Sequence, residues 1–357
     1  MGWIVDGPYR TPQLLPLQRT LWNRKTYERM LEKGETRVAY ADWMEGGIPF
    51  WRAFETLLRT GLVVVSGVPT TETAVEDVAG RIGEIQTTFY GKTWDVKSKP
   101  RAENVAYTSQ FLGLHQDLMY YDPVPRLQLL HCLENSCEGG ESMFSDGLRA
   151  AYEMEVAHEG GMFESLTKPT PFFHYKKNGH DYEMRRETIH LAGNLINRLH
   201  WSPPFQAPFL RPSMEDTPEG PAVRIKSGRR GLEQWHEAAA LFQRSVELGK
   251  NRVQMKLMPG ECVVFDNWRV LHGRREFKPG QGERWLKGTY VSDQVTRARE
   301  TELQRRDPVR FSRAERRPGL GDEIPRLEMD THLNRAKLAK QERLGAVKLL
   351  KLEHSLE

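Results

Sequence analysis

The spacing of hydrophobic residues changes along this chain, and each spacing predicts a type of element. From 49 to about 84, "PFWRAFETLLRT" has helical spacing, "GLVVVSGV" is a β-branched run, and "ETAVEDVAGRIGEI" returns to helical spacing. From about 103 to 295 strands dominate, broken by Gly and Pro, and "RLQLLHCL", "ECVVFD" and "RWLKGTYV" are the clearest. One amphipathic helix interrupts them at "GLEQWHEAAALFQRSVELG", with Leu232, Trp235, Ala239, Phe242 and Val246 on one face.

This order of elements predicts a fold class and three regions. A mostly antiparallel β core with helices packed outside is typical of a double-stranded β-helix, the cupin-like jelly roll. We expect that domain to span 49–300, after an N-terminal wrapping segment over 1–48. Residues 301–357 are rich in Arg, Glu and Pro and predict a charged extension with an amphipathic helix near 331–352.

Composition narrows the class of protein. Of 357 residues, 38% are hydrophobic and 28% charged, which predicts a soluble globular protein. The chain shows no membrane-length apolar run and no signal peptide pattern at its start, so we expect no membrane partner. The three cysteines, Cys132, Cys137 and Cys262, form no CxxC pair and suit a reducing, cytoplasmic setting. A net charge of +4 without a compact basic block predicts no nucleic-acid partner.

Two separated segments carry residues that could bind a metal. In "GLHQDLMYYD", His115 and Asp117 flank one residue, so on an extended strand their side chains point the same way. In "MPGECVVFDNWRVLHGRREF", His272 follows a predicted strand. Two histidines and one carboxylate on one face of an octahedron leave three positions open, which is the non-haem Fe(II) arrangement. Arg284, twelve residues after His272, offers a guanidinium that would grip the distal carboxylate of 2-oxoglutarate.

Each of these residues also has an ordinary structural interpretation. An isolated HxD is common by chance, His272 could be a turn histidine, and Arg284 could be a surface arginine. The ordered combination is much rarer than its parts and favours a metal site. We expect His131, inside "LLHC", to be a satisfied core histidine and the cysteines to be packing residues.

At this point the chain resembles a known family. "ENVAYTSQFLGLHQD", "LQLLHCLENSCEGGESMFSDG", and "FDNWRVLHGRREF" followed by "RWLKGTY" look like the γ-butyrobetaine and trimethyllysine hydroxylases, a branch of the taurine-dioxygenase-like Fe(II)/2-oxoglutarate oxygenases. The likeness covers roughly 20–300. It implies an oxidoreductase with the jelly-roll fold, iron bound by His115, Asp117 and His272, and 2-oxoglutarate held by Arg284. It also implies dioxygen as a cosubstrate, ascorbate as an accessory reductant, and a place in carnitine biosynthesis.

The resemblance further implies a substrate pocket. γ-Butyrobetaine hydroxylases hold a trimethylammonium group in an aromatic cage, and ring faces suit a quaternary cation because it has no N–H to donate. The matching positions are all aromatic here: Tyr90, Trp94, Tyr107 and Tyr290. Aromatic residues also fill β-rich cores, so the same four residues fit a plain packing role.

Several positions bear on the substrate. Asn104 matches a position that contacts the polar end of the substrate, where the trimethyllysine branch prefers an acid, so Asn favours a carboxylate-ended substrate. Leu118 stands where a Tyr commonly follows the aspartate, and Ser202 stands where the family tends to place an asparagine. The cysteines and histidines of the animal enzymes' N-terminal zinc module have no counterpart, so we expect no structural zinc.

Three hypotheses about function remain. The first is an Fe(II)/2-oxoglutarate hydroxylase of a small betaine-like molecule, with γ-butyrobetaine first. The second keeps the chemistry but replaces the substrate with an amino acid or a specialised-metabolism intermediate, as the Leu118 and Ser202 departures suggest. The third is a non-enzymatic barrel that binds a quaternary ammonium compound, although such a barrel has no use for the triad and Arg284. By analogy with relatives, we also expect the protein to form a homodimer.

Overall fold

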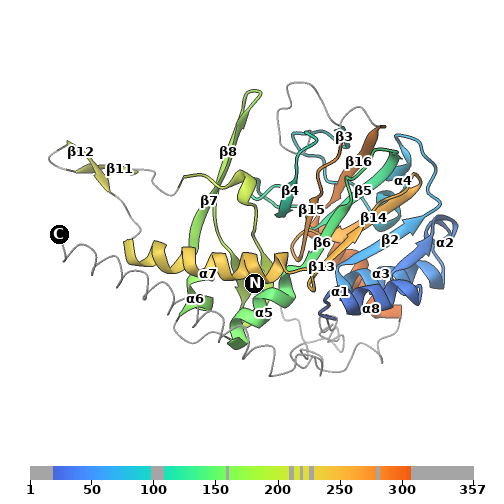
Figure 1. Cartoon of the computed structure of the whole chain (residues 1–357), viewed down its shortest axis with the longest axis horizontal. Coiled ribbons are helices and arrows are strands. Elements are labelled where there is room, and N and C mark those ends of the chain that lie inside the picture. Colours follow the sequence, from blue (N-terminus) through green and yellow to red (C-terminus); the bar gives the residue numbers. More distant parts are fainter. Residues whose placement is uncertain are drawn as a thin grey trace, which may run out of the picture. The chain divides into compact units, whose positions relative to one another are not determined.

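Two β-sheets lie face to face, with an apolar core between them (Figure 1). The computed structural model describes residues 19–97, 108–157, 161–208, 213–217, 220–224, 229–278 and 282–306. The larger sheet contains, in spatial order, β1 (Arg37–Ala39), β2 (Leu62–Ser66), β14 (Glu261–Asp266), β5 (Leu127–Asn135), β16 (Arg284–Val291) and β3 (Trp94–Lys97). The smaller sheet contains β13 (Arg252–Met255), β6 (Ser142–Asp146), β15 (Val270–Arg274) and β4 (Leu112–His115). This is the predicted double-stranded β-helix.

Strand β2 shows why the larger sheet is so apolar. Successive side chains of a strand point to opposite faces of its sheet. Leu62 and Val64 belong to the core between the two sheets, whereas Val63 and Val65 belong to the core on the other face. All four are fully buried, so the strand reads as a continuous apolar run rather than an alternation.

Helices cover the outer face of the larger sheet, where Figure 1 shows them gathered on one side. They are α2 (Tyr40–Glu45), α3 (Ile48–Thr60), α4 (Ala74–Ile82) and α8 (Asp293–Arg306). The helix α3 ends at Gly61, whose φ of 78° is a left-handed conformation that glycine adopts without a Cβ penalty. The helices predicted on either side of β2 are therefore confirmed.

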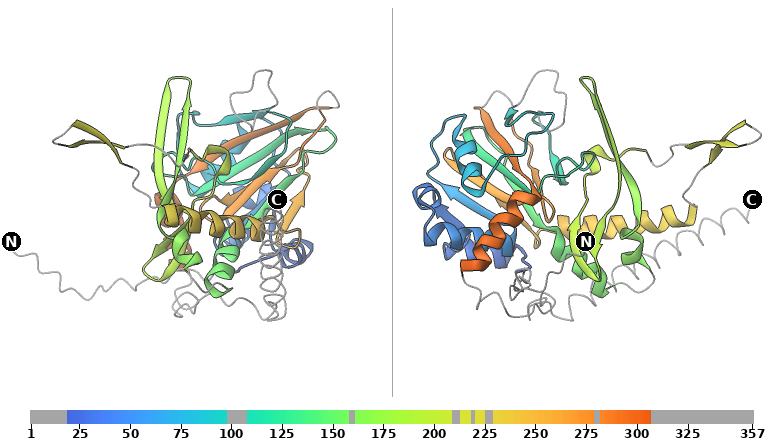
Figure 2. Two further views of the ribbon diagram at one scale, coloured as in Figure 1. Left: turned by 60° about the vertical axis from the view of Figure 1, so that its left-hand side comes forward. Right: turned by 180° about the vertical axis from the view of Figure 1, so that it is seen from behind.

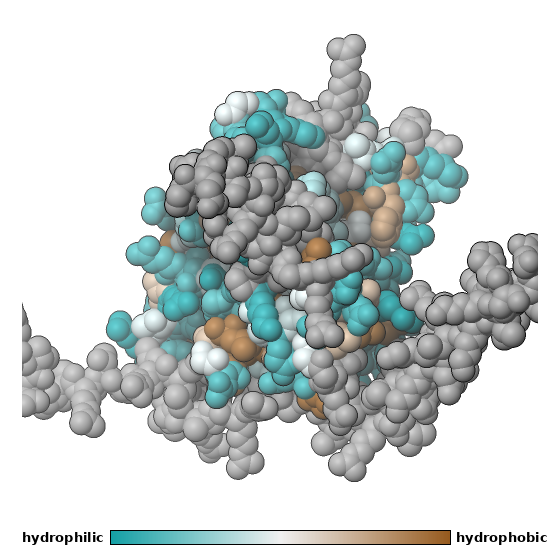
Figure 3. Space-filling view, turned by 90° about the vertical axis from the view of Figure 1, so that its left-hand side faces the viewer, coloured by the Kyte–Doolittle hydropathy of each residue, from teal (hydrophilic) through white to brown (hydrophobic). Residues whose placement is uncertain are grey.

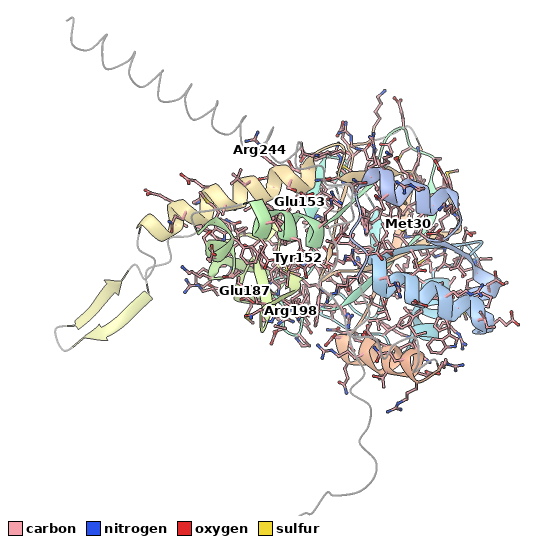
Figure 4. All side chains as sticks on the ribbon, turned by 90° about the horizontal axis from the view of Figure 1, so that it is seen from below. Met30, Tyr152, Glu153, Glu187, Arg198 and Arg244 are labelled. Atoms are coloured by element: carbon pink, nitrogen blue, oxygen red, sulfur yellow. The ribbon has the colours of Figure 1, made fainter. Side chains whose placement is uncertain are left out.

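Three further helices pack together beside the smaller sheet: α5 (Gly147–Ala157), α6 (Met162–Leu166) and α7 (Arg229–Glu247). The sequence predicted only α7, and the expectation of a single interrupting helix is wrong. Helix α5 touches β10, β15, α6 and α7, so it is buried on more than one side and lacks the single apolar stripe that would reveal it. Figure 4 shows Glu153 of α5 beside α7, where its carboxylate accepts a hydrogen bond from Ser245 at 2.8 Å.

Within the described ranges, three β-hairpins form outside the two sheets. The longest pairs β7 (Pro169–Lys177) with β8 (His180–Glu187), and Figure 2 shows it as an extended ribbon. Its Phe173 and Tyr175 pack against Leu118 and Tyr120, which follow β4. The others pair β9 (Ile189–Ala192) with β10 (Leu195–Leu199) and β11 (Ser213–Thr217) with β12 (Gly220–Arg224), and the short 3-10 helix η2 (Pro203–Phe205) follows β10.

The described part of the predicted wrapping segment joins the body. It contributes Trp22, helix α1 (Arg24–Glu32), β1 and α2. The Trp22 side chain is fully buried, and its indole N–H donates to the Thr60 carbonyl at 2.6 Å. The helix expected near 331–352 lies outside the described residues, and the predicted region boundaries remain predictions.

The described surface is mostly polar on the face that Figure 3 presents. Among its coloured residues, hydrophobic side chains are scattered between hydrophilic ones. No helix in the described ranges has both the length and the apolar content needed to cross a membrane.

Candidate metal centre and substrate pocket

The pairing of β4 with β15 brings the two predicted histidines together. His115 is the last residue of β4, and its partner in the antiparallel register is His272. Residues paired in this way project to the same face of a sheet. The two imidazole rings accordingly lie 4.3 Å apart, centroid to centroid. Strand β4 ends at His115, so Asp117 lies in the segment that follows it rather than on the strand itself.

The side chain of Asp117 completes the cluster. Its Oδ1 lies 3.3 Å from His115 Nε2, and its Oδ2 lies 3.9 Å from His272 Nε2. One ligand atom from each of the three residues lies within 4.8 Å of the others. His115 Nδ1 lies 2.9 Å from the Gly113 carbonyl, which can only accept, so Nδ1 carries the proton and Nε2 keeps its lone pair for a metal.

The electrostatics of the cluster favour the forms that bind metals. Burial alone would raise the pKa of Asp117, but the adjacent His272 and His115 and the Tyr290 hydroxyl outweigh it and hold that pKa well below its usual range. Burial and the neighbouring His115 lower the pKa of His272 to about 3, although Asp117 acts in the opposite direction. At neutral pH the cluster therefore presents a carboxylate and a neutral His272.

This donor set fits Fe(II). Two imidazole nitrogens and one carboxylate oxygen lie within 4.8 Å of one another, and such a triad leaves positions open for other ligands. None of the three cysteines belongs to the cluster; all three are free and buried, in keeping with a packing role.

Two buried arginines line the same pocket. Arg284 opens β16, is 7% exposed, and its Nε donates to the Gly140 carbonyl at 3.3 Å. Within the described residues it forms no salt bridge. Arg274 on β15 donates to the Thr108 and Gln110 carbonyls at 2.7 and 2.8 Å. Burial lowers the pKa of each guanidinium to about 10, and both remain charged at neutral pH. The pocket wall therefore offers positive charge to an anion.

Aromatic side chains also line the pocket. The Trp94 and Tyr290 rings stack at 4.1 Å with an interplanar angle of 22°. The hydroxyls of Tyr90 and Tyr120 lie 3.1 Å apart, and Phe205 packs 5.0 Å from the Tyr120 ring. These five rings line the pocket together with the metal cluster and both arginines, and below we call them the aromatic wall.

Comparison with protein families decides the classification. Residues 30–290 match the model of the taurine catabolism dioxygenase TauD, TfdA family. The chain belongs to this family.

Several proteins with sequences similar to this TauD, TfdA family chain are named dioxygenases. Dioxygenase str8 of Strobilurus tenacellus is 38% identical over 254 residues, which are 67% of this chain and 56% of that protein. The mitochondrial trimethyllysine dioxygenase of Mus musculus is 29% identical over 294 residues, 82% of this chain and 66% of the relative. The gamma-butyrobetaine dioxygenase of Homo sapiens is 28% identical over 264 residues, 72% and 63% respectively. The chain thus spans between about half and two thirds of the length of these relatives.

A solved structure agrees with the fold. An asparagine oxygenase in complex with Fe(II), 2S,3S-3-hydroxyasparagine and succinate superposes with a TM-score of 0.50 at 15% identity, covering 72% of this chain and 93% of that one. At this identity the likeness concerns the fold alone. Together the comparisons confirm the predicted family and the jelly-roll fold class.

The structure describes four of the six predicted substrate-pocket residues of this TauD, TfdA family chain. Tyr90, Trp94 and Tyr290 line it, whereas Asn104 and Tyr107 lie outside the described residues. Ser202 is 1% exposed and precedes η2, but it is not among the lining residues, and its hydroxyl has no hydrogen-bond partner in the described part of the chain. Its neighbour Phe205 reaches the pocket instead.

Sequence reasoning missed the residue that fixes the backbone of the metal loop. Asn267 is fully buried in the turn between β14 and β15. The Asp117 amide donates to its Oδ1 at 2.9 Å, and its Nδ2 donates back to the Asp117 carbonyl at 3.0 Å. This paired contact ties the segment after His115 to the turn that leads into His272, and no spacing rule in the sequence announces it.

His131 differs in part from expectation, and Arg274 was not predicted. His131 is fully buried and lies outside the metal-ligand cluster, as expected of a core histidine, but neither ring nitrogen has the expected hydrogen-bond partner among the described residues. Burial lowers its pKa to about 4 and keeps the ring neutral. Arg274 could have been found, because it lies two residues after His272 and a strand returns to the same face every second residue.

Proposed function

We propose that this chain is an Fe(II)- and 2-oxoglutarate-dependent dioxygenase that hydroxylates a small molecule held against the aromatic wall. One observation carries the proposal: a single pocket contains the convergent His115, Asp117 and His272 side chains and the buried, positively charged Arg284. Membership of the TauD, TfdA family and the dioxygenase names of the relatives support it.

Each group in the pocket has a distinct task. His115, Asp117 and His272 would hold the iron. Arg284 would hold the distal carboxylate of 2-oxoglutarate with two parallel charge-assisted hydrogen bonds, and Arg274 adds positive charge to the same wall. Bound iron, with 2-oxoglutarate and dioxygen, supplies the oxidative decarboxylation that yields succinate and CO2 and the insertion of one oxygen atom into a C–H bond. The aromatic wall excludes water and orients the substrate, which is the main contribution a protein can make to such a reaction.

A betaine is the first candidate for the substrate, and γ-butyrobetaine is the first betaine to test. With that substrate the enzyme would act in carnitine biosynthesis. Tyr90, Trp94 and Tyr290 supply ring faces near the metal cluster, and ring faces attract a trimethylammonium group. The names of two relatives, a trimethyllysine dioxygenase and a gamma-butyrobetaine dioxygenase, point the same way.

A substrate without trimethylammonium, such as an amino acid or a specialised-metabolism intermediate, is the second candidate. One face of Trp94 is covered by Tyr290, and the hydroxyls of Tyr90 and Tyr120 are paired with each other. Those contacts favour a closed apolar wall over an open cation cage. They apply equally to an uncharged aliphatic or aromatic group.

Release of succinate from 2-oxoglutarate, measured with a substrate panel, tests the proposal. The panel contains γ-butyrobetaine, trimethyllysine, free amino acids and neutral isosteres. Iron-dependent succinate release coupled to a hydroxylated product supports the dioxygenase, and the preferred compound selects between the two candidates. A chain that binds quaternary ammonium compounds but releases no succinate with any panel member would instead be the non-enzymatic binding barrel.

A further inference from the structure

One oxygen of the Asp117 carboxylate receives two hydrogen bonds from the larger sheet. Gln128 Nε2 donates to Oδ2 at 2.7 Å, and the Tyr290 hydroxyl donates to the same oxygen at 2.9 Å. Gln128 lies on β5 and Tyr290 on β16, and the two residues are direct partners in the antiparallel register. The register that builds the sheet therefore also aligns two donors on a single oxygen atom.

Both donors are held in place. Gln128 is 1% exposed and Tyr290 is 2% exposed, so water does not compete for either group. A tyrosine hydroxyl carries its proton at neutral pH, and the only acceptor that Tyr290 meets among the described residues is the Asp117 carboxylate. The Gln128 Oε1 atom has no hydrogen-bond partner among the described residues, so the side-chain amide is held by the hydrogen bond that its NH2 group donates to Asp117.

The other carboxylate oxygen is differently placed. Asp117 Oδ1 faces His115 Nε2 at 3.3 Å and accepts neither of these two hydrogen bonds, whereas Oδ2, which accepts both, lies 3.9 Å from His272 Nε2. A carboxylate with both oxygens free can bind a metal through both and so occupy one more coordination position. A carboxylate with one oxygen committed to two donors offers the metal a single oxygen.

We propose that Gln128 and Tyr290 are positioning residues that clamp Asp117 Oδ2 and so present Oδ1 alone to the metal, which keeps the remaining positions open. The inference rests on the proposed function, because it concerns the same metal centre. Tyr290 also makes a second contact, because its ring stacks on Trp94 in the aromatic wall. The same side chain thus touches the metal ligand through its hydroxyl and the substrate side through its ring.

The test separates the hydroxyl from the ring. Tyr290→Phe removes the donor and keeps the stacked ring, and Gln128→Met removes the amide and keeps a side chain of similar length. Tyr27→Phe is the matched control, since Tyr27 is also fully buried and its hydroxyl bonds a carbonyl, that of Leu62, away from the pocket. The full chain is stripped of metal with a chelator and titrated with Co(II), without 2-oxoglutarate or substrate. Affinity and the visible absorption bands of bound Co(II), which respond to coordination number, are recorded.

We expect Tyr290→Phe and Gln128→Met each to weaken Co(II) binding about tenfold or more, as loss of a partner of a metal ligand commonly does. The absorption bands should change as well, the double variant should be weaker than either, and Tyr27→Phe should match the wild type. Melting curves of the metal-free proteins identify a variant that does not fold. If one variant does not fold, the Co(II) affinity of the other variant, whose substitution lies on a different strand, tests the clamp.

Unchanged affinity and spectra in the folded variants would overturn the clamp. The outcome is separable from the fate of the proposed function. A wild type that binds Co(II) and releases succinate, with variants that bind equally well, removes the clamp and leaves the dioxygenase. Variants that bind Co(II) weakly, in a protein that releases no succinate with any panel member, leave the clamp and remove the dioxygenase.

Discussion

The metal side of the pocket and its aromatic wall are built in different ways. His115, His272 and Arg284 lie on strands, and β15 and β16 each pair with a neighbour on both sides. The wall takes Tyr90 from the segment before β3, Tyr120 from the segment after β4, and Phe205 from η2, and only Trp94 and Tyr290 come from strands. Strand pairing positions both histidines and Arg284, and Asp117 follows β4 directly, whereas connecting segments supply three of the five rings of the aromatic wall. Such segments tolerate change more readily than paired strands.

Removing a metal ligand should have the largest effect, because the metal side has no substitute for a lost donor. We expect His115→Ala or His272→Ala to abolish iron-dependent succinate release while circular dichroism shows an intact fold. His236→Ala, on the exposed face of α7, is the control and should retain wild-type turnover. Near wild-type succinate release by either ligand variant would show that the triad is wrongly assigned.

Arg284→Ala should come next in size. Loss of a buried charge-assisted pair costs on the order of 2 to 5 kcal/mol, so the 2-oxoglutarate concentration needed for half-maximal rate should rise steeply. The requirement for substrate should change far less, and Arg284→Lys should recover part of the loss because it keeps the charge but not the planar fork. An unchanged 2-oxoglutarate dependence would transfer this role to another cation, with Arg274 first.

The metal side was predictable because its signals are local and carry chemistry. The HxD spacing, the strand before His272 and the distance to Arg284 can all be seen in the sequence, and the helix-strand-helix pattern around β2 gave the covering layer. The resemblance to the oxygenase family added the order of these segments. Each of these signals depends on residues that are neighbours in sequence or on a chemistry that few residue types supply.

The supporting contacts were not predictable, because they depend on which strands become neighbours in space. Gln128 reaches Asp117 only because β5 pairs with β16, and Asn267 does so only because the β14–β15 turn meets the end of β4. An amide side chain in an apolar strand gives no sign of which carboxylate it will meet. Helix α5 was missed for a related reason, since a helix buried on several sides loses its periodic stripe.

The register between β16 and β3 offers a way to disturb the wall alone. Gly288 pairs directly with Trp94, and a Cβ added at Gly288 would lie 2.4 Å from the Trp94 ring. We expect Gly288→Ala to displace that ring at a cost of about 1 to 3 kcal/mol in the free energy of unfolding, as overpacking usually does. Substrate affinity should fall with it.

Gly80→Ala provides the matched control for that substitution. Gly80 lies in α4 with no atom within 4 Å of an added Cβ, so alanine should be neutral or slightly stabilising there. Equal melting temperatures for the two variants would mean that Trp94 moves aside at no cost and that the wall is looser than its stacking implies. The Co(II) affinity of Gly288→Ala shows whether the disturbance is confined to the aromatic wall or also reaches the metal ligands.

The smallest predicted effect tests whether the wall is a cation cage. If Trp94 and its neighbours hold a trimethylammonium group, Trp94→Leu keeps apolar bulk but removes the ring face. It should then lose on the order of 1 to 2 kcal/mol of affinity for γ-butyrobetaine, up to about thirtyfold. The isostere with a tert-butyl group in place of trimethylammonium should bind the wild type much more weakly and lose little more in the variant. That crossed pattern, measured by calorimetry on protein loaded with Co(II) and 2-oxoglutarate, separates a cage from a merely apolar wall, in which both ligands would weaken alike. Parallel losses would leave the metal side unaffected and would make a substrate without trimethylammonium the leading candidate, in accord with the Trp94 face that Tyr290 already covers.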